Sequence, residues 1–181
     1  MSEAHDATAP PSDLVARWSQ PQWAGLLTSI VEAKALPTAA GRLDLRRASW
    51  SGVDLRHAEL RWADLRGATL EAAQLNGADL CGLDLRTANL SSAVLRGADM
   101  CAANCQEADL RGADFSYADL SFTRFQRARL EGARFCGADL SAVDFSEASV
   151  ADADFSGALY DRQTRWPAGL EISGLGLILE D

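Results

Sequence analysis

Residues 43–67 read LDLRR ASWSG VDLRH AELRW ADLRG. The same five-residue pattern continues to residue 162, which gives twenty-four consecutive pentads without an insertion or a deletion. Self-similarity at a fixed short period is the sequence signature of a repeat protein. The repeat therefore decides the fold of most of the chain.

Two of the five positions in each pentad are apolar. The third residue is Leu in fourteen pentads and Phe in five, and it is never charged, while the first residue is Ala in nineteen. A polar residue separates these two positions, and this alternation predicts a short strand whose apolar side chains face inward. All nine glycines within the repeats fall in the fifth position, where a tight turn with positive φ would use them.

A unit of five residues is too short to hold a strand and a hairpin, so the chain must turn in the same direction after each unit and coil. Four units closing a square give a coil of twenty residues, and the twenty-four units give six coils, a rod about 29 Å long. The pentad pattern A(D/N)LXX resembles that of the pentapeptide repeat family. The resemblance implies an all-β solenoid, a right-handed quadrilateral parallel β-helix.

The chain divides into four segments by composition and period. Residues 1–11 are rich in Ala, Pro, Ser and acidic residues and are predicted to be a disordered arm. Residues 12–42 carry apolar residues at helical spacing and predict a short N-terminal helical cap over the first coil, or alternatively a helix that docks a partner. The β-helix is predicted over residues 43–162, and a capping or dimerisation segment over residues 163–181.

The apolar C-terminal segment leaves two interpretations open. It covers the last coil, or it buries against a second copy of the chain. The resemblance supports the second interpretation, because gyrase-protecting members of the family dimerise through their C-terminal ends. The candidate dimer contacts are Leu175, Leu177 and Leu179.

The composition restricts the classes of function. A formal net charge of −9 argues against nonspecific binding of nucleic acid, since phosphate contacts need positive charge. No apolar run is long enough to span a bilayer and the N-terminus does not resemble a signal peptide, so we expect neither membrane insertion nor secretion. The cysteine usage predicts a reduced, cytoplasmic chain.

The sequence offers no catalytic constellation. Its two histidines, His5 and His57, have no nucleophile and orienting acid around them, and no glycine-rich phosphate loop is present. Cys101 and Cys105 have a spacing found in metal sites, but Cys105 is a core residue at the third position of its pentad. We therefore expect a protein that is not an enzyme, with no cofactor and no metal site.

Cys81 and Cys101 lie one coil apart in the same outward column. Stacked strands would place their Cα atoms about 4.8 Å apart, within the range of a disulfide. Two reduced thiols are the favoured interpretation for a cytoplasmic protein, and a disulfide is the alternative.

Charged residues form two candidate binding surfaces on the rod. One column of second-position residues stacks five acids, whose repulsion of about 1 kcal/mol per neighbouring pair in water does not favour folding. This column imitates the phosphate backbone of DNA, or it reflects only the preference of the turn for Asp as a hydrogen-bond acceptor. We call it the acidic stripe; it contains Glu59, Asp79, Asp99, Asp119 and Asp139. The second candidate surface, the basic belt, contains Arg124, Arg127, Arg129 and Arg134.

Two classes of function follow from these features. In the first, the rod mimics DNA, binds a type II topoisomerase such as DNA gyrase and confers resistance to a drug or a toxin, as the resemblance implies for some family members. The acidic charge, the rod shape and the apolar C-terminal segment favour this class. In the second, the rod is a general protein–protein interaction scaffold whose partner the sequence does not identify.

Overall fold

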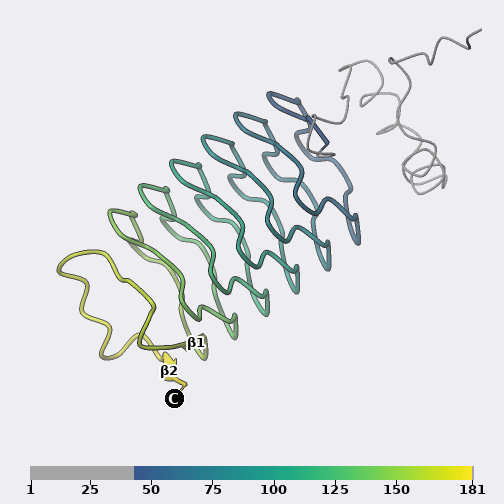
Figure 1. Cartoon of the computed structure of the whole chain (residues 1–181). Helices are drawn as coiled ribbons and strands as arrows, with labels where there is room; N and C mark the ends of the chain where they lie inside the picture. The colour runs from purple at the N-terminus through teal and green to yellow at the C-terminus, as the bar shows by residue number, and fades with distance from the viewer. Residues whose placement is uncertain (1–42, 181) are drawn as a thin grey trace, which may run out of the picture.

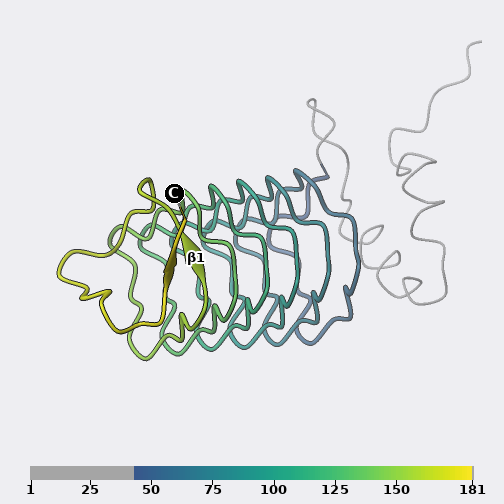
Figure 2. The same cartoon turned by 90° about the horizontal axis from the view of Figure 1, so that it is seen from below.

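The computed structural model describes residues 43–180, so the predicted arm (1–11) and helical cap (12–42) lie outside the described residues. Figure 1 shows the described chain as a series of similar coils stacked along one axis, and Figure 2 shows the same stack after a quarter turn. This architecture is a β-helix type solenoid. Its right-handedness and its number of coils stay predictions.

Parallel pairing between successive coils holds the solenoid together. The second residue of each pentad pairs with the residue twenty positions later, as in the ladder from Asp44 to Asp64 to Asp84. In this ladder the Leu45 N–H donates to the Asp64 carbonyl at 2.8 Å, and the Asp64 N–H donates to the Leu43 carbonyl at 2.9 Å. The same pattern recurs around the rod, which confirms the predicted twenty-residue period. Each backbone strand of an inner coil therefore has partners on both sides.

The corners of the coils lie at the fifth position of the pentads, as predicted. All nine glycines of the repeats have positive φ there, and so do fourteen residues of other types, with φ between 54° and 62°. Glycine is favoured at these corners because it has no Cβ to collide with the backbone, but it is not required. The corner closes with a hydrogen bond such as that from the Ala48 N–H to the Leu45 carbonyl at 3.1 Å.

The first and third residues of the pentads form one continuous core. The inner phenylalanines lie in two parallel stacks in the C-terminal half of the rod. One stack contains Phe115, Phe135 and Phe155, with ring centroids 5.1 and 4.9 Å apart. The other contains Phe125, Phe145 and Trp166, with 5.3 Å between successive rings. The participation of Trp166 was not predicted, because it lies beyond the last regular pentad.

The twenty-residue period fails near the end of the predicted β-helix (43–162). Asp144 pairs with Arg165, twenty-one residues later, so the final turn contains one additional residue. Strand β1 (Leu159–Tyr160) then pairs in parallel with strand β2 (Ile178–Leu179) at the C-terminal end of the rod (Figure 1). The C-terminal segment thus adds a further layer to the last coil. Residues 43–180 include no helix of the length and hydrophobicity that crossing a bilayer requires.

The three candidate dimer contacts differ in exposure. Leu175 and Leu177 pack, partly buried, against the core, which agrees with the interpretation that the segment covers the last coil. Leu179, in contrast, is 49% exposed, and its neighbour Ile178 is 51% exposed. Their role in contact with a second copy stays a prediction.

Candidate functional site

The acidic stripe is one continuous ladder. Glu59 pairs with Asp79, and the pairing then proceeds coil by coil to Asp139. The ladder continues beyond the stripe, because Asp139 pairs with Leu159 and Leu159 pairs with Ile178 of β2. The side of the rod that bears this ladder, with the two rows of corners that border it, is called the acidic face below.

Each aspartate of the stripe stabilises the corner that follows it. One carboxylate oxygen, Oδ1, accepts a hydrogen bond from the backbone N–H two residues later; the donors are Cys81 at 3.4 Å, Cys101 at 3.1 Å, Ser121 at 2.9 Å and Ser141 at 2.9 Å. Other faces use the same contact, as in Asp154 with Ser156. Asp is thus a turn-former throughout the repeats, which supports the structural interpretation of the stripe without removing its charge.

One arginine neutralises part of the stripe. The Arg61 guanidinium forms an ion pair with Asp79 and a second, at 3.2 Å, with Asp99, so it bridges two coils. Among residues 43–180, no cation lies within ion-pair distance of Asp119 or Asp139. The uncompensated negative charge of the stripe is therefore concentrated toward the C-terminal half. Sequence reasoning missed the Arg61 bridge, since Arg61 belongs to a different column.

Exposed aromatic side chains border the acidic stripe. Trp62 and Phe122 occupy the row of corners that follows the stripe, and they are 48% and 61% exposed. Tyr117, which is 67% exposed, occupies the row that precedes it. The ring of Trp62 covers Gly82 of the next coil so closely that a Cβ there would overlap with it, and Tyr117 covers Gly137 in a similar way.

All the large apolar side chains that are exposed in the described part of the chain belong to this one region. Besides the three aromatic residues they are Ile178 and Leu179, where Ile178 is the last member of the ladder. The acidic face thus combines a row of carboxylates, aromatic borders and an apolar end. The sequence carried the signal for the aromatic borders, because the twenty-residue period places Trp62, Tyr117 and Phe122 beside the stripe, whereas Ile178 and Leu179 lie beyond the repeats.

The basic belt does not form a single surface. Arg124, Arg129 and Arg134 belong to three different ladders. Arg127 pairs with Glu147 at 2.9 Å, and Arg129 with Asp109 at 3.4 Å. Arg134 lies 4.0 Å from Asp114. Arg124 lines a surface hollow of about 510 Å³ together with Asp144 and Arg165, among others. The role of the belt as a contact site stays a prediction.

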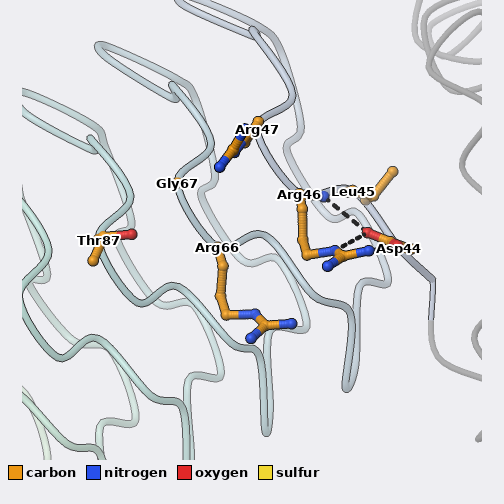
Figure 3. Close-up of a pocket in the computed structure, with 7 residues that line it drawn as sticks. All are labelled: Asp44, Leu45, Arg46, Arg47, Arg66, Gly67 and Thr87. Carbon is orange, nitrogen blue, oxygen red and sulfur yellow. Dashed lines mark hydrogen bonds and ion pairs between the residues drawn. The ribbon is translucent and has the colours of Figure 1, made fainter.

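A second hollow, of about 550 Å³, lies at the N-terminal end of the described rod and is lined by Asp44, Arg46, Arg47 and Arg66, among others (Figure 3). Arg46 pairs with Asp44 at 2.7 Å, and the same pair recurs one coil later, where Arg66 lies 2.6 Å from Asp64. The hydrogen bond from Arg46 lowers the pKa of Asp44. Of its lining residues, Asp44 is acidic and Arg46, Arg47 and Arg66 are basic, so the lining carries net positive charge.

The four cysteines are free thiols. Cys105 is fully buried in the core, as predicted, and burial raises its pKa. Cys81 is also buried, with 6% of its surface exposed, but it lies outside the apolar core cluster, beside Cys101 and the Asp99 carboxylate. Burial and a hydrogen bond to Cys81 raise the pKa of the half-buried Cys101 to about 12.

Comparison with known proteins agrees with this architecture. The family model described as pentapeptide repeats matches in eight copies, which span residues 42 to 159. A search of curated proteins gave no match.

Solved structures of pentapeptide repeat proteins resemble the chain. HetL from Nostoc sp. strain PCC 7120, a protein involved in heterocyst differentiation regulation, shares 26% identity over 78% of this chain and 73% of its own, with a TM-score of 0.55. A trypsin-treated variant of QnrB1, a plasmid-mediated fluoroquinolone resistance protein, shares 24% identity over 77% of this chain and 83% of its own, with a TM-score of 0.54.

Rfr23 from the cyanobacterium Cyanothece 51142 shares 26% identity over 54% of this chain, with a TM-score of 0.47, and the match spans 63% of the Rfr23 chain. The family model covers more than half of the sequence, and the structure contains the parallel ladders that such repeats form. The chain therefore belongs to the pentapeptide repeat family.

Proposed function

We propose that the protein is a non-catalytic rod that binds a partner protein through its acidic face. One observation carries the proposal: the exposed large apolar side chains of residues 43–180 all gather on the face that holds the acidic stripe, or on its borders. Exposed apolar groups scattered singly are ordinary, whereas their collection in one region indicates a binding surface. Aromatic residues such as Trp62 and Tyr117 are also the types enriched in the energetic centres of protein interfaces.

The charge of the acidic stripe selects a basic partner. Carboxylates in successive coils lie about 4.8 Å apart, compared with about 3.4 Å between charges along one DNA strand. The stripe is thus a somewhat sparser row of negative charge than DNA, held on a rigid backbone. A protein that binds DNA must present basic groups to the phosphates. We therefore propose a type II topoisomerase such as DNA gyrase as the partner, with resistance to a drug or toxin as the consequence.

Two further features accompany this proposal. A partner of this kind requires the protein to be cytoplasmic. The exposed side chains of Ile178 and Leu179 at the end of the rod support a homodimer through the C-terminal segment, which would lengthen the acidic face.

A general interaction scaffold is the second candidate. The hydrogen bonds that the aspartates of the stripe accept from the backbone of their corners favour it, because they explain the recurrence of Asp without any partner. The similarity to HetL also favours it, since that protein is involved in the regulation of differentiation. In this case the aromatic borders bind the partner and the charge of the stripe contributes little.

The test compares two variants that remove the same charge from different faces. The first replaces Asp79, Asp99, Asp119 and Asp139 by Asn; the control replaces Asp109, Asp114, Asp144 and Asp154 by Asn. Both sets occupy the second position of their pentads, and the amide oxygen of Asn can still accept the hydrogen bond of the corner. Gyrase affinity and supercoiling activity, with and without a quinolone, are measured for wild type and both variants across a salt series.

If the stripe mimics DNA, the first variant loses gyrase affinity and its remaining binding depends less on salt, while the control keeps most of its affinity. Equal losses in both variants would show that only net charge matters. If the wild-type protein does not bind gyrase at low salt, the proposal that its partner is a type II topoisomerase is rejected. A third variant, with Trp62, Tyr117 and Phe122 replaced by Ala, tests the acidic face independently of charge.

A further inference from the structure

Two thiols and a carboxylate converge on the acidic face, in an arrangement that the proposed function does not use. The Sγ atoms of Cys81 and Cys101 and a carboxylate oxygen of Asp99 all lie within 4.8 Å of one another. Within residues 43–180 they form the one group of three potential metal ligands that is this compact. Cys81 is buried, whereas Asp99 and Cys101 are half-buried, so the group is recessed but accessible from solvent.

The repeat itself brings the three groups together. Cys81 and Cys101 follow Asp79 and Asp99 by two residues in stacked coils, and the parallel pairing of Asp79 with Asp99 fixes their register. In a tetrahedral zinc site, with Zn–S near 2.3 Å and Zn–O near 2.0–2.2 Å, the ligand atoms lie about 3.5–3.8 Å apart. The observed group needs only small side-chain rotations to reach that spacing.

The surroundings orient the carboxylate and balance the charge. The Cys101 N–H donates to Asp99 Oδ1 at 3.1 Å, and Arg61 donates to Asp99 Oδ2 at 3.2 Å. Hydrogen bonds of this kind to a ligating carboxylate fix its orientation around a metal. With a divalent ion bound, the negative groups are two thiolates and the carboxylates of Asp79 and Asp99. The ion and the Arg61 guanidinium supply three positive charges, so the group keeps one net negative charge.

We propose that Cys81, Cys101 and Asp99 bind a thiophilic divalent metal ion of the Zn²⁺ class, with water as the fourth ligand. Two thiolates select such ions over Mg²⁺ and Ca²⁺, which prefer oxygen ligands. Binding breaks the S–H bond of each cysteine, forms two metal–sulfur bonds and releases two protons to the buffer. No oxidant takes part, because the sulfur atoms keep their oxidation state.

The other cysteines do not offer such a site. Cys105 is fully buried in the core and belongs to no compact group of three potential ligands among residues 43–180. Cys136 donates to Asp154 at 3.0 Å but has no second thiol beside it. In the coil after Cys101, the corresponding residues are Asp119 and Ser121, where the hydroxyl replaces the thiol.

The experiment titrates the full, reduced chain with Co²⁺ and follows the thiolate-to-metal charge-transfer absorption, then displaces Co²⁺ with Zn²⁺. We expect one Co²⁺ per chain. Cys81→Ser and Cys101→Ser should each weaken binding by more than the roughly 10–100-fold that loss of an outer-shell partner costs. Asp99→Asn should weaken it at least about tenfold. The matched controls Cys136→Ser and Asp119→Asn should bind as wild type does.

Circular dichroism verifies that each variant is folded, and the half-buried Cys101 provides a test even if replacement of the buried Cys81 disturbs the coil. Affinity that is unchanged in Cys101→Ser would overturn the proposal. So would a wild-type chain that binds no Co²⁺ when reduced, or one in which the two thiols form a disulfide under conditions where Zn²⁺ is present in excess. None of these outcomes depends on whether the protein binds gyrase.

Discussion

Replacement of Phe135 by Ala tests whether the aromatic stacks hold the C-terminal half of the rod together. Phe135 is fully buried between Phe115, 5.1 Å away, and Phe155, 4.9 Å away. It also meets Phe125 and Phe145 edge to face, at 6.2 and 5.7 Å. A Phe→Ala change in such a core costs about 3–5 kcal/mol, because it removes apolar burial and leaves a cavity.

Part of this cost belongs to ring contacts rather than to burial. Phe135→Leu retains most of the apolar volume but loses the stacked and edge-to-face contacts, each type being worth about 0.5–1.5 kcal/mol beyond its area. We therefore expect Phe135→Leu to lie between wild type and Phe135→Ala. Urea unfolding followed by circular dichroism measures the difference. For a loss of about 3 kcal/mol and a slope of about 1–3 kcal/mol per molar urea, the midpoint should fall by about 1 M or more.

Phe122→Ala is the matched control, because Phe122 has the same side chain but is 61% exposed. It should change the free energy of unfolding by less than about 0.5 kcal/mol. If Phe135→Ala were no more destabilising than Phe122→Ala, the stacks would contribute nothing to stability and the reasoning would be refuted. Equal destabilisation by Phe135→Leu and Phe135→Ala would show that the ring geometry matters and residual volume does not.

Three further predictions concern the corners, the end of the rod and its pH dependence. Gly82→Ala should destabilise the protein more than Gly97→Ala, because both glycines have positive φ but only Gly82 is covered by the Trp62 ring; equal urea midpoints would contradict this. Asp161→Ala should increase hydrogen exchange in residues 140–166, since Asp161 Oδ1 accepts bonds from three backbone N–H groups, each at 2.9 Å, and unchanged exchange would show that these bonds are dispensable. Hydrogen bonds from Ser156 and Cys136 lower the pKa of Asp154 to about 2 from 3.8. The contribution of Asp154 to stability is therefore present above pH 3.8 and is lost as the pH falls toward 2. In urea unfolding measured at each pH, the midpoint of Asp154→Asn should fall less over this pH range than that of wild type.

Much of the fold follows from the period alone. A strict five-residue repeat fixes which side chains face inward, and the twenty-residue coil fixes which residues stack, so the sequence by itself assigns the acidic stripe to one ladder. The corners are assigned in the same way, although the structure accepts residues such as Trp62 and Tyr117 there at positive φ. Positions assigned by counting in units of five and twenty residues are reliable because no insertion shifts the register before residue 160.

The features that were missed depend on side-chain reach or on the end of the repeat. Arg61 contacts the carboxylates of Asp79 and Asp99, which are 18 and 38 residues away in the sequence. The register of the repeats does not determine in which direction along the rod a long side chain extends. Trp166 joins the second aromatic stack only because the final turn contains one additional residue. The burial of Cys81 was missed because the period assigns residues to a column but not how far other side chains cover them; Cys101, in the same column, is half-buried.

The distribution of exposed apolar side chains bears on the proposal that the acidic stripe is a binding surface rather than a simple repeat consensus. If Asp recurred only to form corners, the face that bears the stripe should resemble the others, because Asp154 and Ser156 make the same contact elsewhere. Instead, Trp62, Tyr117 and Phe122 lie on the two rows of corners that border this face, and each exposes about half or more of its surface to water. Ala102 and Ala142 occupy the same row of corners as Trp62 and Phe122, with similar positive φ. The corner conformation therefore does not require a large ring, and binding of a partner, as proposed above, is a property that would retain such rings beside a row of carboxylates.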